Sequence, residues 1–289
     1  MRKYVVLTDS ACDLPQEMAE QHHIDILCFK IAFDGVGYTE RVDFTPEAFS
    51  AMLRETTGMP TTSQITQYEF FDRFEQYDRE GIEEVLYISI NATGSATNTN
   101  AHAAAAQFAE EHPDSRMRVT IVDSHSYSVT YGIECCRAAD MLGEGKTMEE
   151  VAAYLDDRFA RLELVITAYD LAVIRKSGRI SAAAAIAGSL LGIHPIITLI
   201  DGESKVVKKV RGEKQVLSGV IGHCKGNMIP GTAYYIGVTN MKYAALYSKA
   251  AEESIGYPPA GVFHLGSAVC SNTGPECAAM LYEGERRER

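Results

Sequence analysis

Apolar and polar residues occur in blocks along this chain, most clearly between residues 85 and 107. Residues 85–90 form an apolar run rich in β-branched side chains, which predicts a buried strand. Residues 91–100 are small or polar, and residues 101–107 are mainly alanine, the strongest helix former. The pattern therefore predicts a strand that leads through a polar loop into a helix.

The same order occurs twice more in the first half of the chain. Residues 4–7 and 118–122 are predicted strands, and each is followed by a polar segment and a predicted helix, over 16–22 and 128–142. This repeat is typical of a parallel, Rossmann-like α/β sheet with ligand loops at the carboxyl ends of its strands. We therefore expect the polar loops to converge on one edge of the sheet. They contain Ser10, Ser95 and Ser124, and a further hydroxyl cluster spans Thr61 to Gln64.

Local signals predict the other elements of this half. Residues 24–33 form a second strand region that ends at Asp34-Gly35. Thr45-Pro46-Glu47 predicts the start of a helix that continues to Arg54, and Ser10 or Asp13 is expected to cap the helix over 16–22. Three aromatic residues, Tyr68, Phe71 and Phe74, recur at helical spacing. This pattern predicts that they belong to the core and do not form a base-stacking surface.

The pattern changes near residue 162. Residues 195–200 and 205–210 flank Asp201-Gly202 and predict a β-hairpin. Hairpin-linked strands mixed with helices indicate a second domain of mixed or antiparallel α+β type. We therefore expect an N-terminal α/β domain over 1–162 and a C-terminal α+β domain over 163–289. Further strands are predicted over 164–168, 234–238 and 260–265, and helices over 182–191, 216–224 and 242–254.

Composition narrows the class of protein. The chain has 289 residues, of which 46% are apolar, and this is enough for a sizeable core. Its net charge of −12 argues against a nucleic-acid-binding protein, which needs a basic surface. No apolar run reaches the length of a membrane span, and the apolar stretch after Lys3 is too short for a signal peptide. We expect a cytoplasmic protein without stable membrane insertion.

The seven cysteines are odd in number and scattered, and none forms a Cys-x-x-Cys pair. This usage is typical of reduced, mostly buried thiols in a cytosolic protein. They are Cys12, Cys28, Cys135, Cys136, Cys224, Cys270 and Cys277.

The common catalytic and cofactor motifs are missing. The sequence has no His-Glu-x-x-His, no Gly-x-Ser-x-Gly and no Gly-x-Gly-x-x-Gly after the first strand, so we expect no metal site. Residues 143–147 resemble part of a phosphate loop, but the preceding segment is helical and Thr147 with Glu150 forms a capping box for a helix to about Phe159. What remains is a set of hydroxyl loops, which suits a carboxylate held by neutral donors.

The loop after residue 90 has two interpretations. Free backbone N–H groups at the start of the alanine-rich helix form an anion site, to which Thr93, Ser95 and Thr97 add hydroxyl donors. Alternatively, Ser95, Thr97 or Asn98 simply caps that helix.

Several short motifs together resemble the DegV family, in matching order along essentially the whole chain. They begin with Thr8-Asp9-Ser10 and Asp13-Leu14-Pro15, and the closing Asn272-Thr273-Gly274-Pro275 is similar to the family's His-Thr-Gly-Pro. This sequence departs from the family pattern in several places: Asn272 replaces histidine, Gly94 replaces leucine and Ala96 replaces glycine. Lys176-Ser177-Gly178 also stands where the family has a double glycine. The other matching motifs are Thr62-Ser63-Gln64, Ser95 with Thr97, Asp123-Ser124, Lys176-x-Gly178-Arg179-Ile180-Ser181 and Arg211-Gly212.

The resemblance implies two α/β domains with one fatty acid, such as palmitate, stearate or oleate, buried in a cleft between them. It also implies a non-catalytic, acyl-binding subunit of bacterial fatty acid kinase. A separate kinase subunit would phosphorylate the carboxylate, and the acyl phosphate would enter phospholipid synthesis. By position, Thr62 and Ser95 would hydrogen-bond the carboxylate, and Arg179 and Arg211 would face the kinase. The other ligand-binding positions would be Ser63, Ala96, Asn272 and Thr273.

Two other classes of function stay open from the residues alone. One is an enzyme or sensor that binds a small polar carboxylate or phosphorylated ligand in the same cleft. The other is a protein-interaction module without a cleft ligand. Arg179 and Arg211 also fit ordinary surface salt bridges.

Overall fold

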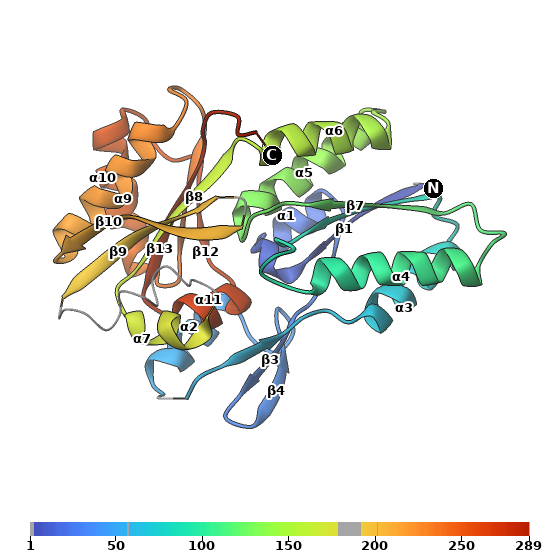
Figure 1. The fold of residues 1–289 in the computed structure, drawn as a ribbon, viewed down its shortest axis with the longest axis horizontal. Coiled ribbons are helices and arrows are strands. Elements are labelled where there is room, and N and C mark those ends of the chain that lie inside the picture. Colours follow the sequence, from blue (N-terminus) through green and yellow to red (C-terminus); the bar gives the residue numbers. More distant parts are fainter. Residues whose placement is uncertain (1–2, 57, 179–191, 201, 289) are drawn as a thin grey trace.

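The computed structural model describes residues 3–56, 58–178, 192–200 and 202–288, which form two main sheets and one small sheet (Figure 1). The N-terminal sheet is parallel and has the order β2-β1-β6-β7. The predicted parallel, Rossmann-like architecture is therefore confirmed. Its strands are β1 (Tyr4–Asp9), β2 (Ile24–Leu27), β6 (Glu84–Ser89) and β7 (Arg118–Asp123).

Helices cover both faces of this sheet. In Figure 1, α3 and α4 lie together on one side of the sheet, and α5 and α6 lie together on the other. The apolar faces of the sheet and helices form one core, which contains fully buried Leu86, Phe74 and Leu155. The helices are α1 (Gln16–Gln21), α3 (Gln67–Arg79), α4 (Thr97–Glu111), α5 (Val129–Gly143) and α6 (Met148–Phe159), and a 3-10 turn, η1 (Ser10–Cys12), precedes α1.

The second main sheet is mixed and has the order β10-β9-β8-β13-β11-β12. Only β11 and β12 pair in parallel among its described strands, so the predicted mixed or antiparallel second domain is confirmed. Its strands are β8 (Leu162–Ala168), β9 (Ile193–Ile200), β10 (Glu203–Arg211), β11 (Tyr234–Val238), β12 (Gly261–His264) and β13 (Cys277–Glu283). The helices beside it are α7 (Leu171–Ser177), α9 (Glu213–Asn227), α10 (Lys242–Ile255) and α11 (Ser267–Thr273).

The predicted hairpin is present as β9 and β10, which pair antiparallel. β13, which lies between β8 and β11 in the middle of the sheet, was not predicted from the sequence. Helices α7 and α11 were not predicted either. The predicted helix over 182–191 and the partner residue Arg179 lie outside the described residues.

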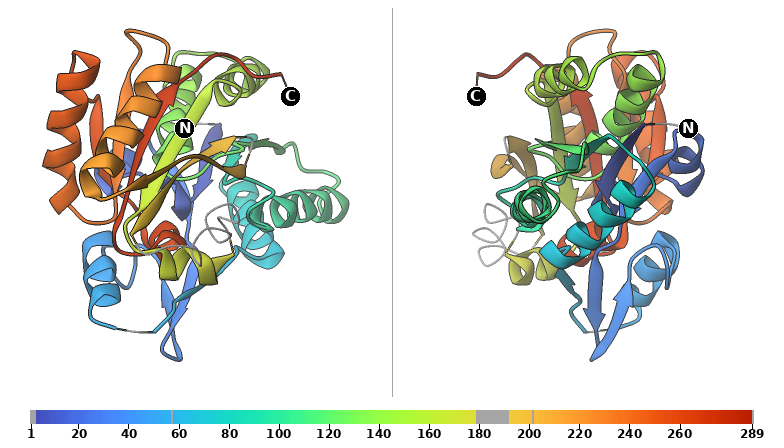
Figure 2. Two further views of the ribbon diagram at one scale, coloured as in Figure 1. Left: turned by 60° about the vertical axis from the view of Figure 1, so that its left-hand side comes forward. Right: turned by 90° about the vertical axis from the view of Figure 1, so that its right-hand side faces the viewer.

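The strand region predicted over 24–33 is two strands in two different sheets. β2 pairs with β1, whereas β3 (Lys30–Phe33) pairs antiparallel with β4 (Val36–Thr39) and β5 (Thr61–Ser63). The β3–β4 hairpin projects from the body of the molecule at the end away from α5 and α6 (Figures 1 and 2). The helix of this unit, α2 (Pro46–Arg54), packs against α11, and Ser50 Oγ donates a hydrogen bond to the carbonyl of Thr239. Helix α2 thus connects this unit of the first half of the chain to the second half.

Helix caps agree with the sequence signals at α2 and α6 but not at α1. Thr45 caps α2, and Thr147 with Glu150 forms the predicted capping box of α6. The prediction that Ser10 or Asp13 caps α1 is wrong, because Pro15 is the N-cap residue and makes no side-chain cap. Both polar side chains are used elsewhere: Ser10 donates to Glu40, and Asp13 accepts from Ser128.

One aromatic prediction is also wrong. Tyr68 is 75% exposed, whereas Phe74 is fully buried and Phe71 packs at the edge of the core. The buried face of α3 instead carries Phe70, Phe74 and Tyr77, which are spaced by four and three residues. None of the described helices is long and apolar enough to cross a membrane. All seven cysteines are free thiols, and all but Cys28 are buried.

Candidate functional site

A cavity of about 610 Å³ lies between the two main sheets. Its walls come from the polar loops of the N-terminal domain, from β5, from one face of the second sheet and from α11. The predicted loops do converge here, since Ala11, Ser95 and Tyr127 of three different loops line the cavity. In two of these loops, however, the serine itself does not line the cavity. Ser10 donates a hydrogen bond to Glu40, and Ser124 donates one to the carbonyl of Ser126.

The second sheet provides the apolar wall. Leu164 of β8 lies opposite Leu199 of β9, and Ile166 of β8 lies opposite Ala279 of β13. Residues two apart on a strand point to the same face, so these four side chains form one continuous apolar patch. All four line the cavity. Ile90 and Val269 extend the patch on the loop side and on α11.

Hydroxyl groups and the start of α4 lie at the opposite wall. Thr62 and Ser95, which are expected to hydrogen-bond the carboxylate, line the cavity. Ser95 Oγ is 2.9 Å from Thr97 Oγ1 and accepts a 3.3 Å hydrogen bond from the Thr97 N–H. The 15-residue helix α4 begins beside these groups and directs the positive end of its dipole at them. This arrangement is suited to an ionised acceptor such as a carboxylate.

The structure bears on whether the start of α4 is an anion site or is simply capped by a side chain. The N-cap residue of α4 is Ala96, which makes no side-chain hydrogen bond, so the prediction that Ser95, Thr97 or Asn98 holds that position is wrong. Asn98 instead donates from Nδ2 to Ser89 Oγ at 2.8 Å. Ser95 contacts the first N–H of the helix, and the other N–H groups of the first turn have no side-chain cap within the described chain.

Asn272 and Thr273 lie on α11 and line the cavity, as does Ala96. Asn272 Nδ2 donates to the carbonyl of Ala268 at 2.8 Å, which leaves its second N–H and its amide oxygen for a ligand. Thr273 Oγ1 donates to the carbonyl of Val269 at 3.0 Å. These bonds to the preceding turn hold both side chains in place along the helix.

Two predicted site residues, Ser63 and Arg211, are exposed, and of these only Ser63 was expected to bind the ligand. Ser63 is exposed and does not line the cavity, because neighbouring residues of β5 point to opposite faces and Thr62 takes the inner one. Arg211 is exposed at the end of β10.

Sequence reasoning did not identify Tyr127 as a cavity residue. Asn91 Nδ2 donates to Tyr127 Oη at 2.8 Å, and this bond holds the phenol over the loop that carries Ser95. A Cβ on Gly94 would lie 2.1 Å from Tyr127 Oη. The glycine that departs from the family leucine therefore provides the space that the tyrosine ring occupies.

Three buried carboxyl groups support the loops of the site. Asp9 accepts hydrogen bonds from Tyr131 Oη at 2.6 Å and from the Ile90 N–H at 2.9 Å, which fixes the start of the Ser95 loop. Glu40 accepts from the Ala268 N–H at 2.7 Å at the start of α11. Burial raises the pKa of Asp9, of Glu40 and of Asp13, and the charge of Glu40 raises that of Asp13 further. The Thr8-Asp9-Ser10 motif already drew attention to Asp9, but no pattern in the sequence indicated that Glu40 would support the site.

Metal ligands are not gathered at the site. The described residues contain no group of three or more histidine, cysteine, aspartate or glutamate side chains that could hold a metal ion.

Comparisons with known proteins agree with this geometry. The model of the DegV family, described as uncharacterised, matches residues 3–285. A DegV domain-containing protein of Clostridium perfringens is 29% identical over 294 residues, which is 100% of both chains. A solved structure described as fatty acid binding of a DegV family protein from Thermus thermophilus is 27% identical, with a TM-score of 0.84 over 98% of this chain and 100% of that one. A stearic-acid-binding protein of Eubacterium ventriosum, 24% identical, shares the fold with a TM-score of 0.87 over 98% of each chain.

Proposed function

Since this chain belongs to the DegV family, we propose that it binds one long-chain fatty acid, such as palmitate, stearate or oleate, in the cavity between its two main sheets. The observation that carries this proposal is the division of the cavity into an apolar wall on β8, β9 and β13 and a hydroxyl-bearing wall at the start of α4. The structure from Thermus thermophilus, which is described as fatty acid binding, supports the same ligand class.

The apolar wall accounts for the affinity. Each buried methylene contributes about 0.8 kcal/mol, so a sixteen-carbon chain gives on the order of 12 kcal/mol before costs. Lost translational and rotational freedom and the ordering of the chain oppose this gain. We expect the remainder to keep the ligand bound through purification.

The hydroxyl wall accounts for the orientation. We place the carboxylate between Thr62 and Ser95, near the positive end of α4. Asn272 faces the same cavity from α11 and is able to donate one N–H to the carboxylate. Unlike histidine, an amide does not change its charge near neutral pH.

The finer proposal concerns what happens to the bound carboxylate. We propose that the protein is a non-catalytic, cytoplasmic subunit that presents the carboxylate to a separate ATP-dependent kinase subunit. Arg179 and Arg211 are the residues we assign to the contact with that partner. The purified protein is then expected to lack ATPase activity alone and to support acyl-phosphate formation only with the kinase present.

A ligand panel tests the ligand class. Delipidated protein is titrated with fatty acids of increasing chain length and, separately, with acetate and inorganic phosphate, and the unfolding midpoint is recorded because a ligand of the folded state raises it. We expect stabilisation that grows with acyl length. Stabilisation by the short anions but not by long chains would favour a sensor or enzyme of a small polar ligand instead.

A further inference from the structure

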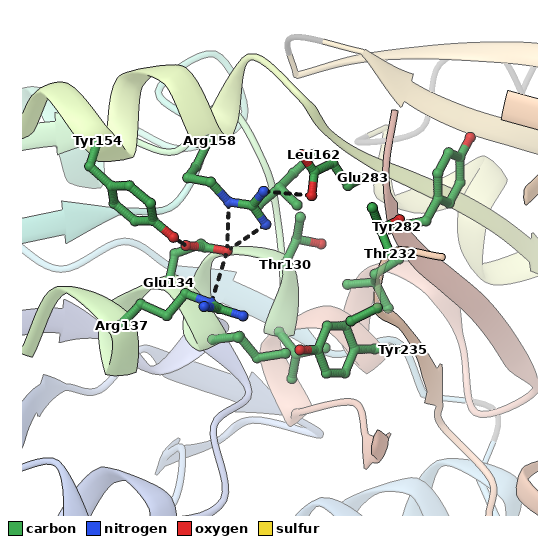
Figure 3. Close-up of a pocket in the computed structure, with 14 residues that line it drawn as sticks. Thr130, Glu134, Arg137, Tyr154, Arg158, Leu162, Thr232, Tyr235, Tyr282 and Glu283 are labelled. Carbon is green, nitrogen blue, oxygen red and sulfur yellow. Dashed lines mark hydrogen bonds and ion pairs between the residues drawn. The ribbon is translucent and has the colours of Figure 1, made fainter. Parts of the chain in front are cut away.

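A second cavity, of about 320 Å³, lies further along the same interface, between α5 and α6 on one side and β11 and β13 on the other (Figure 3). Successive residues of one segment line the two cavities: Tyr127 and Ser128 face the first, and Val129 and Thr130 face the second. The second cavity is about half the volume of the first, so it is suited to a smaller ligand.

Most of the charged groups in its wall are already paired with one another (Figure 3). Glu134, which is 2% exposed, is 3.2 Å from Arg158 Nη2 and accepts a 2.9 Å hydrogen bond from Tyr154 Oη. Arg158 also pairs with Glu283 of β13 at 2.7 Å, across the two domains. Glu134 and Glu283 therefore carry two negative charges beside the single positive charge of Arg158, and Arg137, whose Nε lies 3.9 Å from Glu134, compensates the second.

Thr130 and Arg137 keep donors that these short contacts do not use. Thr130 Oγ1 is buried, in a residue only 4% exposed, and has no hydrogen-bond partner within the described residues. Arg137 is about half exposed and forms a long ion pair with Glu134, in which its Nε lies 3.9 Å from the carboxylate, beyond hydrogen-bond distance (Figure 3). Figure 3 shows Arg137 and Tyr235 pointing toward one another across the cavity. A buried hydroxyl without a partner is unfavourable unless a ligand or water bonds to it.

We propose that this cavity is a binding site for a small oxyanion, a carboxylate or a phosphate. The guanidinium of Arg137 and the hydroxyls of Thr130 and Tyr235 donate to the ligand oxygens. A planar guanidinium with hydroxyl donors matches the acceptor oxygens of such an anion, and charge-assisted bonds are the strong ones. The paired carboxylates leave no counter-charge for a cationic ligand.

An occupant would contact both domains at once. Thr130 and Arg137 belong to α5 of the N-terminal domain, whereas Tyr235 belongs to β11 of the second sheet. A ligand that binds only when these elements are together stabilises the domain arrangement that also encloses the first cavity.

Calorimetric titration of the full-length, lipid-loaded protein tests the site. The probes are inorganic phosphate and butyrate, each compared with chloride at matched ionic strength. We expect saturable binding of at least one probe, weakened about tenfold by Arg137→Gln and by Thr130→Val, as loss of one charge-assisted bond implies. The matched control is Arg116→Gln, at an exposed arginine outside the cavity, and it should leave binding unchanged. Binding of phosphate but not butyrate, or of butyrate but not phosphate, would identify the ligand class.

Binding of neither probe, or equal weakening by the control, would overturn the proposal. The Thr130→Val variant gives a second, independent readout without any probe. Because it removes an unsatisfied buried hydroxyl at nearly constant volume, its unfolding midpoint should equal or exceed that of the parent protein. A lower midpoint would show that the hydroxyl already has a structural partner, and this would also contradict the site.

Discussion

Gly94 and Tyr127 are complementary: a Cβ at residue 94 would lie 2.1 Å from Tyr127 Oη, and the phenol ring occupies the space that a side chain would need. The ring lies beside Ser95 in the wall of the lipid cavity, where Asn91 holds its hydroxyl. The absence of a side chain at one position therefore sets the shape of the cavity at its polar end.

Substituting Gly94 with alanine should weaken fatty acid binding, because the Tyr127 ring must move away from its present position. The loss is expected at about 1–3 kcal/mol, the usual cost of overpacking a well-filled site. Titration of delipidated protein with palmitate measures it. The double variant Gly94→Ala with Tyr127→Ala should lose less affinity than the sum of the losses in the two single variants. A loss in the double variant equal to that sum would refute the coupling.

Thr62 and Ser95 should account for most of the attraction for the carboxylate. Replacing both with alanine is expected to weaken binding by a few kcal/mol, at about 1.5–3 kcal/mol for each hydrogen bond to a charged group. Ser63→Ala is the matched control, since Ser63 is the exposed neighbour on β5. If the double variant binds like the control, neither hydroxyl contacts the ligand.

Asn272→His should make binding depend on pH. A histidine has an ordinary pKa of about 6.5, so its charged form, and the stronger bond to a carboxylate, is gained as the pH falls below that value. Fatty acid affinity of the variant should therefore rise between about pH 7.5 and pH 5.5 relative to the parent chain. A parallel pH profile for both proteins would place residue 272 away from the head group.

Asp13 should make the folded state less stable as the pH rises. Burial and the charge of Glu40 raise the pKa of Asp13, so the folded protein holds this proton more tightly than the unfolded chain does. The contribution to stability is full below the ordinary pKa of about 4 and is lost as the pH rises through the raised value.

Asp13→Asn should remove this part of the pH dependence while keeping an acceptor for Ser128 Oγ, which donates to Asp13 at 2.6 Å. Denaturant unfolding at a series of pH values above 4 should then show a shallower decline for the variant. Asp114→Asn, at an exposed aspartate, should behave like the parent protein. A slope that Asp13→Asn leaves unchanged would contradict this assignment.

Arg211→Glu should separate lipid binding from phosphorylation. Arg211 is exposed and does not line the lipid cavity, so palmitate affinity should stay the same. Acyl-phosphate formation with a kinase subunit should fall, because the charge reversal opposes the proposed contact. Loss of lipid binding, or full activity with the kinase, would reject Arg211 as a partner residue.

Local sequence patterns were sufficient to predict much of the fold. The three strand-loop-helix units, the hairpin of β9 and β10, and the capping box at Thr147 all depend on residues close in sequence. β13 was missed because Ala278-Ala279-Met280-Leu281 fits a short buried helix as well as a strand. Its pairing with β8 and β11, which are distant in sequence, decides between them.

Local sequence patterns were likewise only partly sufficient to predict the site. Thr62, Ser95 and Asn272 were located from motifs, and all three line the cavity. The inward direction of Thr62 and the outward direction of Ser63 follow from the register of β5 against β3, which a short hydroxyl run does not reveal. Glu40 is charged and looks like a surface residue in sequence, but it is buried at the start of α11.

Mass spectrometry of an organic extract from the purified, folded protein tests the central claim most directly. The account predicts one long-chain fatty acid per protein chain, whose mass also gives its chain length. A folded protein that yields no lipid and that fails to take up added fatty acid would contradict it.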